Sequence, residues 1–249
     1  MTEQSMHTSK FFLTAPSECP YLAGREERKI FTHLSGKTAG LMAQVLAESG
    51  FRRSQSLIYR PACEGCAACT SVRVVAGEFA WSKRFRRVQR KNEGVFGIER
   101  PATSTNQQFD LFQRYLIARH KHGGMANMTR ADYEFMVEDT PVDTMLVEYY
   151  GKDGDGCEGL IGVALTDRMS DGLSMVYSFF DPELAANSLG TFIILDHIER
   201  TRQAGLNYLY LGYWVPGSPK MSYKTQFEPI EALHDHSRWE RLTPPDTAE

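Results

Sequence analysis

Apolar positions in the second half of the chain switch repeatedly between helical and strand spacing. Phe109, Phe112 and Leu116 recur at intervals that place them on one face of a helix. Thr129 and Asp132 have the spacing of a capping box at the start of a second helix. Segments rich in Gly and Asp separate the other apolar runs and indicate turns. The pattern predicts helices over 107–121, 129–138, 188–204 and 219–227, and strands over 95–99, 144–150, 160–166, 173–180, 206–211 and 230–233.

The first 92 residues carry shorter patterned segments. Helical spacing covers 38–46, and residues 56–59 and 71–75 are typical of short strands that pair on either side of a loop. A basic run then gives way to alternating apolar positions. The sequence therefore predicts an N-terminal module over 1–92, a catalytic domain over 93–243 and a disordered tail over 244–249.

The order of elements in the second domain resembles the GCN5-related N-acetyltransferase fold. This resemblance implies an α/β (α+β) fold with a mixed sheet flanked by helices, preceded here by a smaller cysteine-containing module. Ligands of that fold lie where two central parallel strands diverge, beside the N-terminus of the following long helix. In this chain the corresponding residues are Asp181 and the donor-binding candidates Ser188, Leu189 and Gly190.

Composition narrows the class of protein. The 249 residues are 42% hydrophobic, which is enough for one large domain or two modest ones. No apolar run approaches the roughly 18 residues of a membrane span, and the N-terminus lacks the apolar centre of a signal peptide, so we expect a cytoplasmic protein. The net charge of −3 argues against a cationic nucleic-acid binder as a whole.

One local segment is strongly basic. Trp81 and Phe85 interleave with its cations, which is typical of a surface that neutralises phosphates and stacks on bases. The alternative is a solvated helix face or a linker. The candidate tRNA-binding residues are Lys83, Arg84, Arg86, Arg87, Arg90 and Lys91.

Three of the five cysteines lie within seven residues, at Cys63, Cys66 and Cys69. Two-residue gaps allow thiolates to converge on one centre, and Cys19 is available as a fourth ligand. Soft thiolates favour zinc or an iron–sulfur cluster, although the remote fourth cysteine makes the match to a ferredoxin motif partial. The alternative is a set of reduced, partly buried thiols at a turn.

The segment before the long helix, residues 185–190, holds a single glycine and no basic side chain. Acetyl-coenzyme A users grip a pyrophosphate at this position with backbone amides and a basic residue. The segment is therefore a poor diphosphate site, which argues against coenzyme A as donor. A donor carried on RNA would instead need a basic surface outside the pocket.

Several motifs together resemble the arginyl-tRNA–protein transferase family, and its bacterial aspartate/glutamate leucyltransferase branch in particular. They are the cysteine turn, Arg119-His120 with Gly123-Gly124-Met125, Ser188-Leu189-Gly190, residues 210–213 and residues 220–224. The resemblance implies transfer of leucine from leucyl-tRNA to proteins that begin with Asp or Glu, in the N-end rule pathway of protein degradation. Leucine rather than arginine as the transferred group rests on this resemblance alone.

The transfer itself needs little acid or base catalysis and no cofactor. An aminoacyl ester is already activated, and an α-amine with a pKa near 8 is partly neutral near neutral pH. In a helix, Lys220, Tyr223 and Lys224 share one face, which suits an anion or a carbonyl oxygen near Tyr213. The alternative is a surface lysine pair beside a packed tyrosine. Asp181 is a candidate proton acceptor or simply the start of a turn.

The acidic first residue of an acceptor requires a cation. Arg60 and Arg73, on either side of the cysteine turn, are the candidates for this role. Rival functions are an arginyl transferase, an acyl-coenzyme A-dependent N-acetyltransferase on the same fold, and a non-catalytic tRNA-binding or metal-sensing protein.

Overall fold

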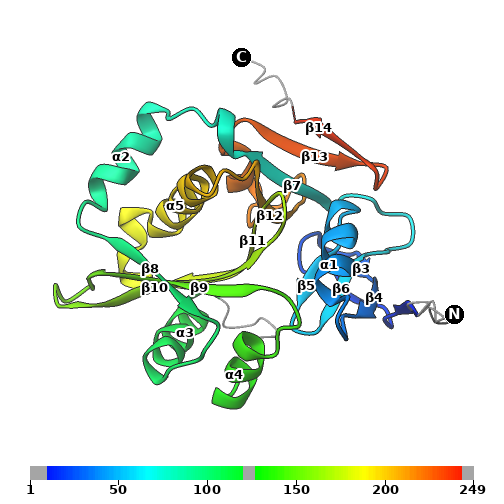
Figure 1. The fold of residues 1–249 in the computed structure, drawn as a ribbon, viewed down its shortest axis with the longest axis horizontal. Coiled ribbons are helices and arrows are strands. Elements are labelled where there is room, and N and C mark those ends of the chain that lie inside the picture. Colours follow the sequence, from blue (N-terminus) through cyan, green and yellow to red (C-terminus); the bar gives the residue numbers. More distant parts are fainter. Residues whose placement is uncertain (1–9, 120–126, 243–249) are drawn as a thin grey trace, which may run out of the picture.

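The computed structural model describes residues 10–119 and 127–242, and a long twisted mixed sheet runs through the larger part of it (Figure 1). Its eight strands in the described residues follow the order β14-β13-β7-β12-β11-β10-β9-β8. In chain order they are β7 (Thr70–Val75), β8 (Phe96–Pro101), β9 (Thr144–Lys152), β10 (Glu158–Arg168), β11 (Gly172–Phe180), β12 (Tyr208–Trp214), β13 (Ile230–His234) and β14 (Arg238–Arg241).

One pair of neighbouring strands in this sheet is parallel, β11 with β12, and it separates early. Pairing starts at Gly172 with Tyr208 and reaches only Ser174 with Tyr210. The register of β12 against β7 also shifts between Tyr210 and Gly212. The C-terminal halves of β11 and β12 therefore diverge in the middle of the sheet, and we call this region the splay.

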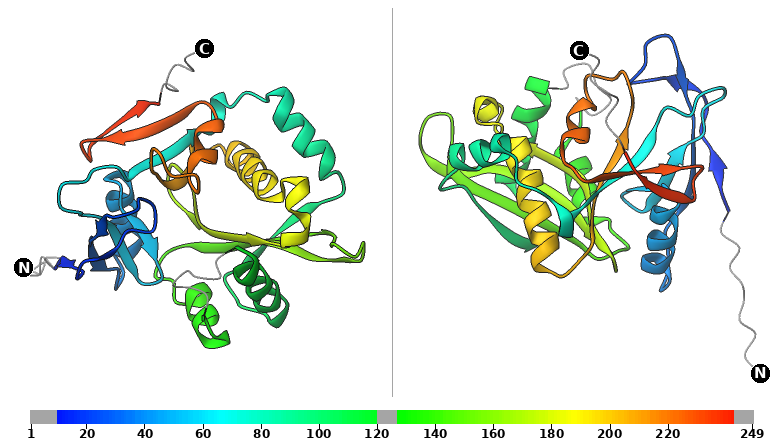
Figure 2. Two further views of the ribbon diagram at one scale, coloured as in Figure 1. Left: turned by 180° about the vertical axis from the view of Figure 1, so that it is seen from behind. Right: turned by 90° about the horizontal axis from the view of Figure 1, so that it is seen from above.

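Helices cover both faces of the sheet (Figures 1 and 2). On one face lie α2 (Lys83–Lys91) and α5 (Leu189–Gln203); on the other lie α3 (Asn106–Arg119) and α4 (Arg130–Glu138). Thr129 caps α4 with a complete capping box, as its spacing predicted. Each face has its own apolar core, the first around Ile193, Leu209 and Phe227 and the second around Phe112, Tyr133 and Phe179.

A small N-terminal unit packs at the side of the splay. Its four-stranded sheet has the order β1-β4-β6-β5, and a separate hairpin pairs β2 with β3. A third apolar cluster, which includes Leu34 and Ile58, lies under its helix. The elements are β1 (Phe12–Leu13), β2 (Ser17–Glu18), β3 (Glu26–Glu27), β4 (Lys29–His33), α1 (Ala39–Glu48), β5 (Arg52–Ser54) and β6 (Leu57–Pro61).

Short 3-10 helices complete the fold: η1 (Ala76–Glu78), η2 (Pro182–Asn187) and η3 (Ser222–Gln226). The helix expected over 219–227 is wrong in extent and type, since only η3 forms there. The tighter 3-10 turn changes which side chains share a face. β14 was not predicted. No helix in residues 10–119 and 127–242 is long and apolar enough to cross a membrane.

The predicted fold class, a mixed sheet flanked by helices, is confirmed. The predicted pairing around the cysteine loop is wrong, because β6 lies in the N-terminal sheet whereas β7 lies between β12 and β13 of the large sheet. β7 therefore lies in the large sheet and α2 packs beside α5, while the predicted division of the chain at residue 92 stays a prediction. The tail over 244–249 and the predicted helix end at 120–121 lie outside the described residues.

Candidate active site

Arg52 lies in the splay, at the point where β11 and β12 stop pairing. Its Nη2 donates a 2.6 Å hydrogen bond to the Met175 carbonyl oxygen on β11. On β12, a Cβ added to Gly212 would lie only 2.9 Å from the Arg52 Cζ, and Gly212 has a φ of +85°. The guanidinium thus packs directly on glycine backbone and holds the two strands apart. The sequence analysis did not identify Arg52.

Lys224 is buried and points into the same region. Its Nζ donates a 2.6 Å hydrogen bond to the Tyr213 carbonyl oxygen at the end of β12. Burial, with a smaller contribution from the Arg52 charge, lowers the Lys224 pKa to about 7. A substantial fraction of this amine is therefore neutral near neutral pH, and a neutral amine can accept a proton.

The Tyr213 hydroxyl has a structural role. It donates to the carbonyl oxygens of Gly50, at 2.8 Å, and Tyr59, at 3.1 Å, and so ties β12 to the N-terminal unit. Burial raises its pKa well above the usual value, with a smaller contribution from Tyr59. The predicted catalytic role of Tyr213 therefore does not pass through its hydroxyl, and it is its carbonyl oxygen that contacts Lys224.

Lys220 and Lys224 do not share a face, which corrects the prediction. Lys220 is exposed, and its Nζ donates to the Pro20 carbonyl oxygen at 3.4 Å, whereas Lys224 points inward. Tyr223 exposes 41% of its surface, yet burial of its phenol raises its pKa to about 12, with a smaller contribution from Tyr115. Tyr223 is therefore a neutral hydroxyl beside the splay.

Asp181 directly follows β11 and is fully buried. One carboxylate oxygen caps η2 by accepting from the Glu183 backbone amide at 3.1 Å. The other oxygen accepts no hydrogen bond from the described residues, and the Arg114 Nη1 on α3 lies 3.5 Å away. Asp181 therefore caps a turn and places its second oxygen in an ion pair with a half-exposed cation, and its role as proton acceptor stays a prediction.

The donor-binding candidates lie where α5 begins. A Cβ on Gly190 would lie 2.7 Å from the Phe180 ring, so the glycine allows the end of β11 to approach the helix. Ser188 has a left-handed backbone with a φ of 58° and makes no side-chain cap. Arg119 of α3 lies over the Phe180 ring at 5.7 Å, which brings a second α3 cation to this end of the splay.

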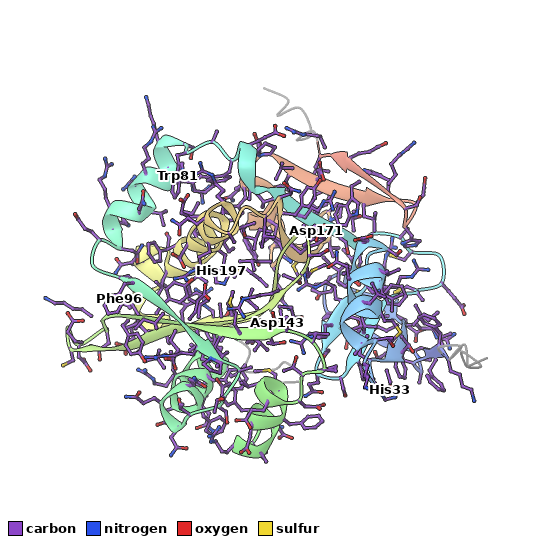
Figure 3. All side chains as sticks on the ribbon, viewed as in Figure 1. His33, Trp81, Phe96, Asp143, Asp171 and His197 are labelled. Carbon is purple, nitrogen blue, oxygen red and sulfur yellow. The ribbon has the colours of Figure 1, made fainter. Side chains whose placement is uncertain are left out.

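The basic segment forms α2, and all six of its candidate cations are exposed. Phe85 is buried and stacks on Phe227 with ring centroids 5.2 Å apart, so its predicted stacking on bases is wrong. Trp81, labelled in Figure 3 at the start of α2, is partly buried against the core. The helix thus presents cations to solvent and its aromatic residues to the protein.

The C-terminal end of α2 is fastened to the segment before α5. Lys91 Nζ donates to the Ala186 carbonyl oxygen at 2.9 Å. Asn92 Nδ2 donates to the Asn187 carbonyl oxygen, also at 2.9 Å. The basic surface is therefore continuous with Ser188-Leu189-Gly190 at the mouth of the splay.

Arg73 is not available to bind a substrate carboxylate, which corrects the prediction. It pairs with Glu231 at 2.9 Å, donates to the Tyr210 hydroxyl at 3.0 Å and lies over the Tyr208 and Trp239 rings. Its charge and its donors are satisfied inside the protein. Arg60 lies over the Phe51 ring in the N-terminal unit, and its role stays a prediction.

His197 is a buried titratable group outside the splay, between α5 and the sheet (Figure 3). Its Nδ1 lies 2.8 Å from the Ile193 carbonyl oxygen and its Nε2 lies 2.9 Å from the Thr166 hydroxyl. Burial lowers its pKa, so a neutral ring with Nδ1 as donor satisfies both contacts. We assign His197 a structural role.

The four predicted cysteine ligands line one cavity beside Tyr59 and Tyr213. Burial raises the Cys69 pKa to about 11, with further contributions from Cys63, Cys19 and Cys66. The donor set suits a soft metal, but no group of three or more His, Cys, Asp or Glu in the described residues is arranged to hold a metal ion. Cys63 instead exchanges contacts with the Arg28 backbone.

Metal or cluster binding by Cys19, Cys63, Cys66 and Cys69 therefore stays a prediction, and no step of the chemistry depends on it. Anaerobic purification followed by metal analysis and visible absorption tests it. A colourless, metal-free protein that keeps its activity would contradict it. Cys157 is exposed in the loop between β9 and β10, away from this set.

Similar proteins were found by sequence over nearly the whole chain. Aspartate/glutamate leucyltransferase of Azorhizobium caulinodans is 54% identical over 248 residues, covering 97% of this chain and 99% of that protein. The protein of the same name from Xanthobacter autotrophicus is 55% identical with the same coverage of both chains. The solved structure of L-PGS from Bacillus licheniformis has a TM-score of 0.41 at 14% identity, covering 64% of this chain and 52% of that one, which is too distant to support an argument.

Two family models match in succession. The N-terminal model of arginine-tRNA-protein transferase matches residues 17–87, and the C-terminal model matches residues 107–234. The first match runs from β2 into the first half of α2, and the second covers α3 from its second residue, α5 and the strands of the splay. The chain therefore belongs to the arginine-tRNA-protein transferase family.

Proposed function

We propose that this protein is an aminoacyl-tRNA–protein transferase that moves leucine from leucyl-tRNA to the α-amine of proteins with N-terminal Asp or Glu. Family membership supports the reaction type, and the relatives named aspartate/glutamate leucyltransferase support the donor and acceptor. The reaction belongs in the cytoplasm, where charged tRNA is made, and it marks acceptors for degradation by the N-end rule pathway.

The observation that carries the proposal is the continuity between α2 and the splay. Six exposed cations stand on a helix whose end is hydrogen-bonded to Ala186 and Asn187, immediately before the N-terminus of α5. A polyanion lying along α2 would bring its end to the mouth of the splay. This arrangement suits an amino acid carried on RNA, because phosphates are neutralised outside while only the acylated end enters.

In the transfer, the neutral α-amine of the acceptor attacks the ester carbonyl carbon of leucyl-tRNA. A C–N bond forms, the ester C–O bond breaks, and the ribose oxygen of the terminal adenosine leaves. The amine loses one proton and the leaving oxygen gains one, so no external oxidant or reductant is needed. Positioning amine and ester together in a cleft from which water is excluded supplies most of the acceleration.

Lys224 is the proton acceptor in this scheme. Its burial and, to a smaller extent, the Arg52 charge lower its pKa to about 7, and its Nζ contacts the Tyr213 carbonyl oxygen and lies over the Tyr223 ring. The two tyrosines stay neutral because their pKa values are raised. A neutral Lys224 can take the proton of the attacking amine and pass it on to the departing oxygen. Asp181 is the second candidate for this proton.

The alternatives are separated by one donor experiment. An amidated peptide that begins with Asp is incubated with the protein and with tRNA charged separately with leucine, arginine or phenylalanine, and the product is weighed. We expect a gain of one leucyl residue from leucyl-tRNA alone. A gain from arginyl-tRNA would reassign the donor.

Two controls address the other functions. A thermal-shift measurement with acetyl-coenzyme A should show no stabilisation, whereas a clear shift would favour an N-acetyltransferase. A non-catalytic tRNA-binding protein would bind charged and uncharged tRNA yet leave the peptide mass unchanged. That last result would refute the proposed function.

A further inference from the structure

Arg52 carries a charge that no carboxylate of the described residues pairs. A guanidinium has five N–H donors, and the one hydrogen bond that Arg52 forms with described residues runs from Nη2 to the Met175 carbonyl oxygen. Its Nη1 is buried without a partner in the described residues. Arg52 also forms no ion pair there, whereas arginines elsewhere in the fold do: Arg28, Arg53, Arg73, Arg100, Arg114, Arg168, Arg200, Arg202, Arg238 and Arg241.

Lys224, which lies in the splay with Arg52, is itself a cation when it is protonated. Arg52 contributes to lowering the Lys224 pKa, and it also acts on the phenols of Tyr213 and Tyr223. Asp181, the carboxylate at the end of β11, is already paired with Arg114. Arg52 is always charged and Lys224 is charged in part near neutral pH, and since neither faces a carboxylate in the described residues, this costs free energy unless an anion joins them. The splay is therefore built to receive negative charge from a ligand.

The number and the shape of the cations inside the splay indicate which kind of anion binds there. α2, outside the splay, already offers six exposed cations for the phosphates of an RNA. Inside, a single planar guanidinium rests on Gly212, with its remaining donors unused, and planar forks of this kind match a carboxylate. A carboxylate bound here lies beside Lys224. An α-amine on the same residue as that carboxylate would then stand next to the proton acceptor.

We propose that Arg52 binds the side-chain carboxylate of the acceptor's N-terminal Asp or Glu and so determines acceptor specificity. The inference rests on the proposed function for the identity of the acceptor. Arg52 takes the role that the sequence predicted for Arg73, whose charge is paired with Glu231. This assignment links acceptor selection to catalysis. Binding of the carboxylate places the α-amine of the same residue near Lys224.

Peptide binding without tRNA tests the inference directly. Two C-terminally amidated peptides that differ only in Asp or Asn at the first position are titrated into wild-type protein and Arg52→Met by calorimetry. The wild type should bind the Asp peptide about 30-fold more tightly or better, since truncating one partner of a buried charge pair has an effect of this order. Arg52→Met should bind both peptides nearly equally.

Arg168→Met is the matched control, because Arg168 is a surface arginine already paired with Glu99 and Asp143. It should keep the wild-type preference. Arg52→Gln gives a second test should the methionine variant fail to fold, and it too should lose the preference. Equal binding of both peptides by the wild type, or an unchanged Asp preference in a folded Arg52 variant, would overturn the inference.

The proposed function can fail separately. A protein that prefers the Asp peptide through Arg52 but transfers no leucine would refute the function and keep the inference. A protein that transfers leucine, and whose Arg52→Met variant loses transfer equally for Asp and Asn peptides, would keep the function and refute the inference. In that case Arg52 would only hold β11 and β12 apart.

Discussion

Arg52 and Arg53 are neighbours on β5, yet the protein treats them in opposite ways. Arg53 is buried and donates two 2.6 Å hydrogen bonds to the Asp167 carboxylate, with a third to the Gln55 carbonyl oxygen. Arg52 points to the other side of the strand, into the splay, and among residues 10–119 and 127–242 it meets one carbonyl oxygen and no carboxylate. Alternation along a strand sends adjacent side chains to opposite faces, so one strand serves two purposes.

The difference separates structure from binding. Arg53, with Asp167 on β10, fastens the N-terminal unit to the large sheet, and Arg73 with Glu231 fastens β7 to β13 in the same manner. These pairs are complete and have nothing left for a ligand. Arg52 and Lys224 form an incomplete set, and an incomplete buried charge is the better marker of a functional site.

The largest effect is expected from removing the Lys224 amine, which together with Arg52 forms the incomplete set. Lys224→Met should lower single-turnover transfer about 10²- to 10⁴-fold, the usual contribution of a general base. Folding should be preserved, because Lys224 is buried and methionine fills similar space without a charge. Rapid-quench measurement with leucyl-tRNA checks the rate. An unchanged rate in Lys224→Met would remove Lys224 from the mechanism.

A smaller effect is expected from pH. With a Lys224 pKa of about 7, the base is protonated and inactive below that pH and neutral above it. Because the acceptor α-amine, with a pKa of about 8, must also be neutral, kcat/KM should rise about a hundredfold per pH unit below pH 7, about tenfold per unit between the two pKa values, and level off above about pH 8. The profile of kcat/KM against pH measures this. A profile that falls as pH rises through 7 would contradict the assignment.

The smallest effect is expected from removing single exposed cations of α2, whose surroundings differ from those of both Arg52 and Arg53. Arg84→Ala and Arg87→Ala should each weaken tRNA binding and lower the slope of log affinity against log salt by about 1. Arg202→Ala, at an exposed arginine paired with Glu199, is the control and should leave the slope unchanged. An unaltered slope in both α2 variants would place the RNA elsewhere.

Local signals in the sequence predicted much of the fold. The capping box at Thr129, the helical stripe of α3 and the apolar strands β9 to β12 depend on neighbours within a few residues, so the pattern reports them. The partners of β6 and β7 were mispredicted because strand pairing is set by distant segments. The same limit explains β14, which was missed altogether.

The site was less predictable for similar reasons. Lys224 was identified, but the 3-10 geometry of η3 turns it inward and leaves Lys220 outside. Arg73 has the right charge, and only tertiary structure shows that Glu231 uses it. Two adjacent arginines on a short strand were a signal that could have drawn attention to Arg52. The sequence does not show, however, that no carboxylate of the described residues pairs with it.

The claim that paired and unpaired arginines serve different ends is tested most directly by the free energy of unfolding in urea. Arg53→Met should lose about 3–5 kcal/mol, since Asp167 is left buried and unpaired. Arg52→Met should change by no more than about 1 kcal/mol, because one hydrogen bond is lost while an unpaired buried charge is removed. Equal destabilisation of the two variants would contradict the account.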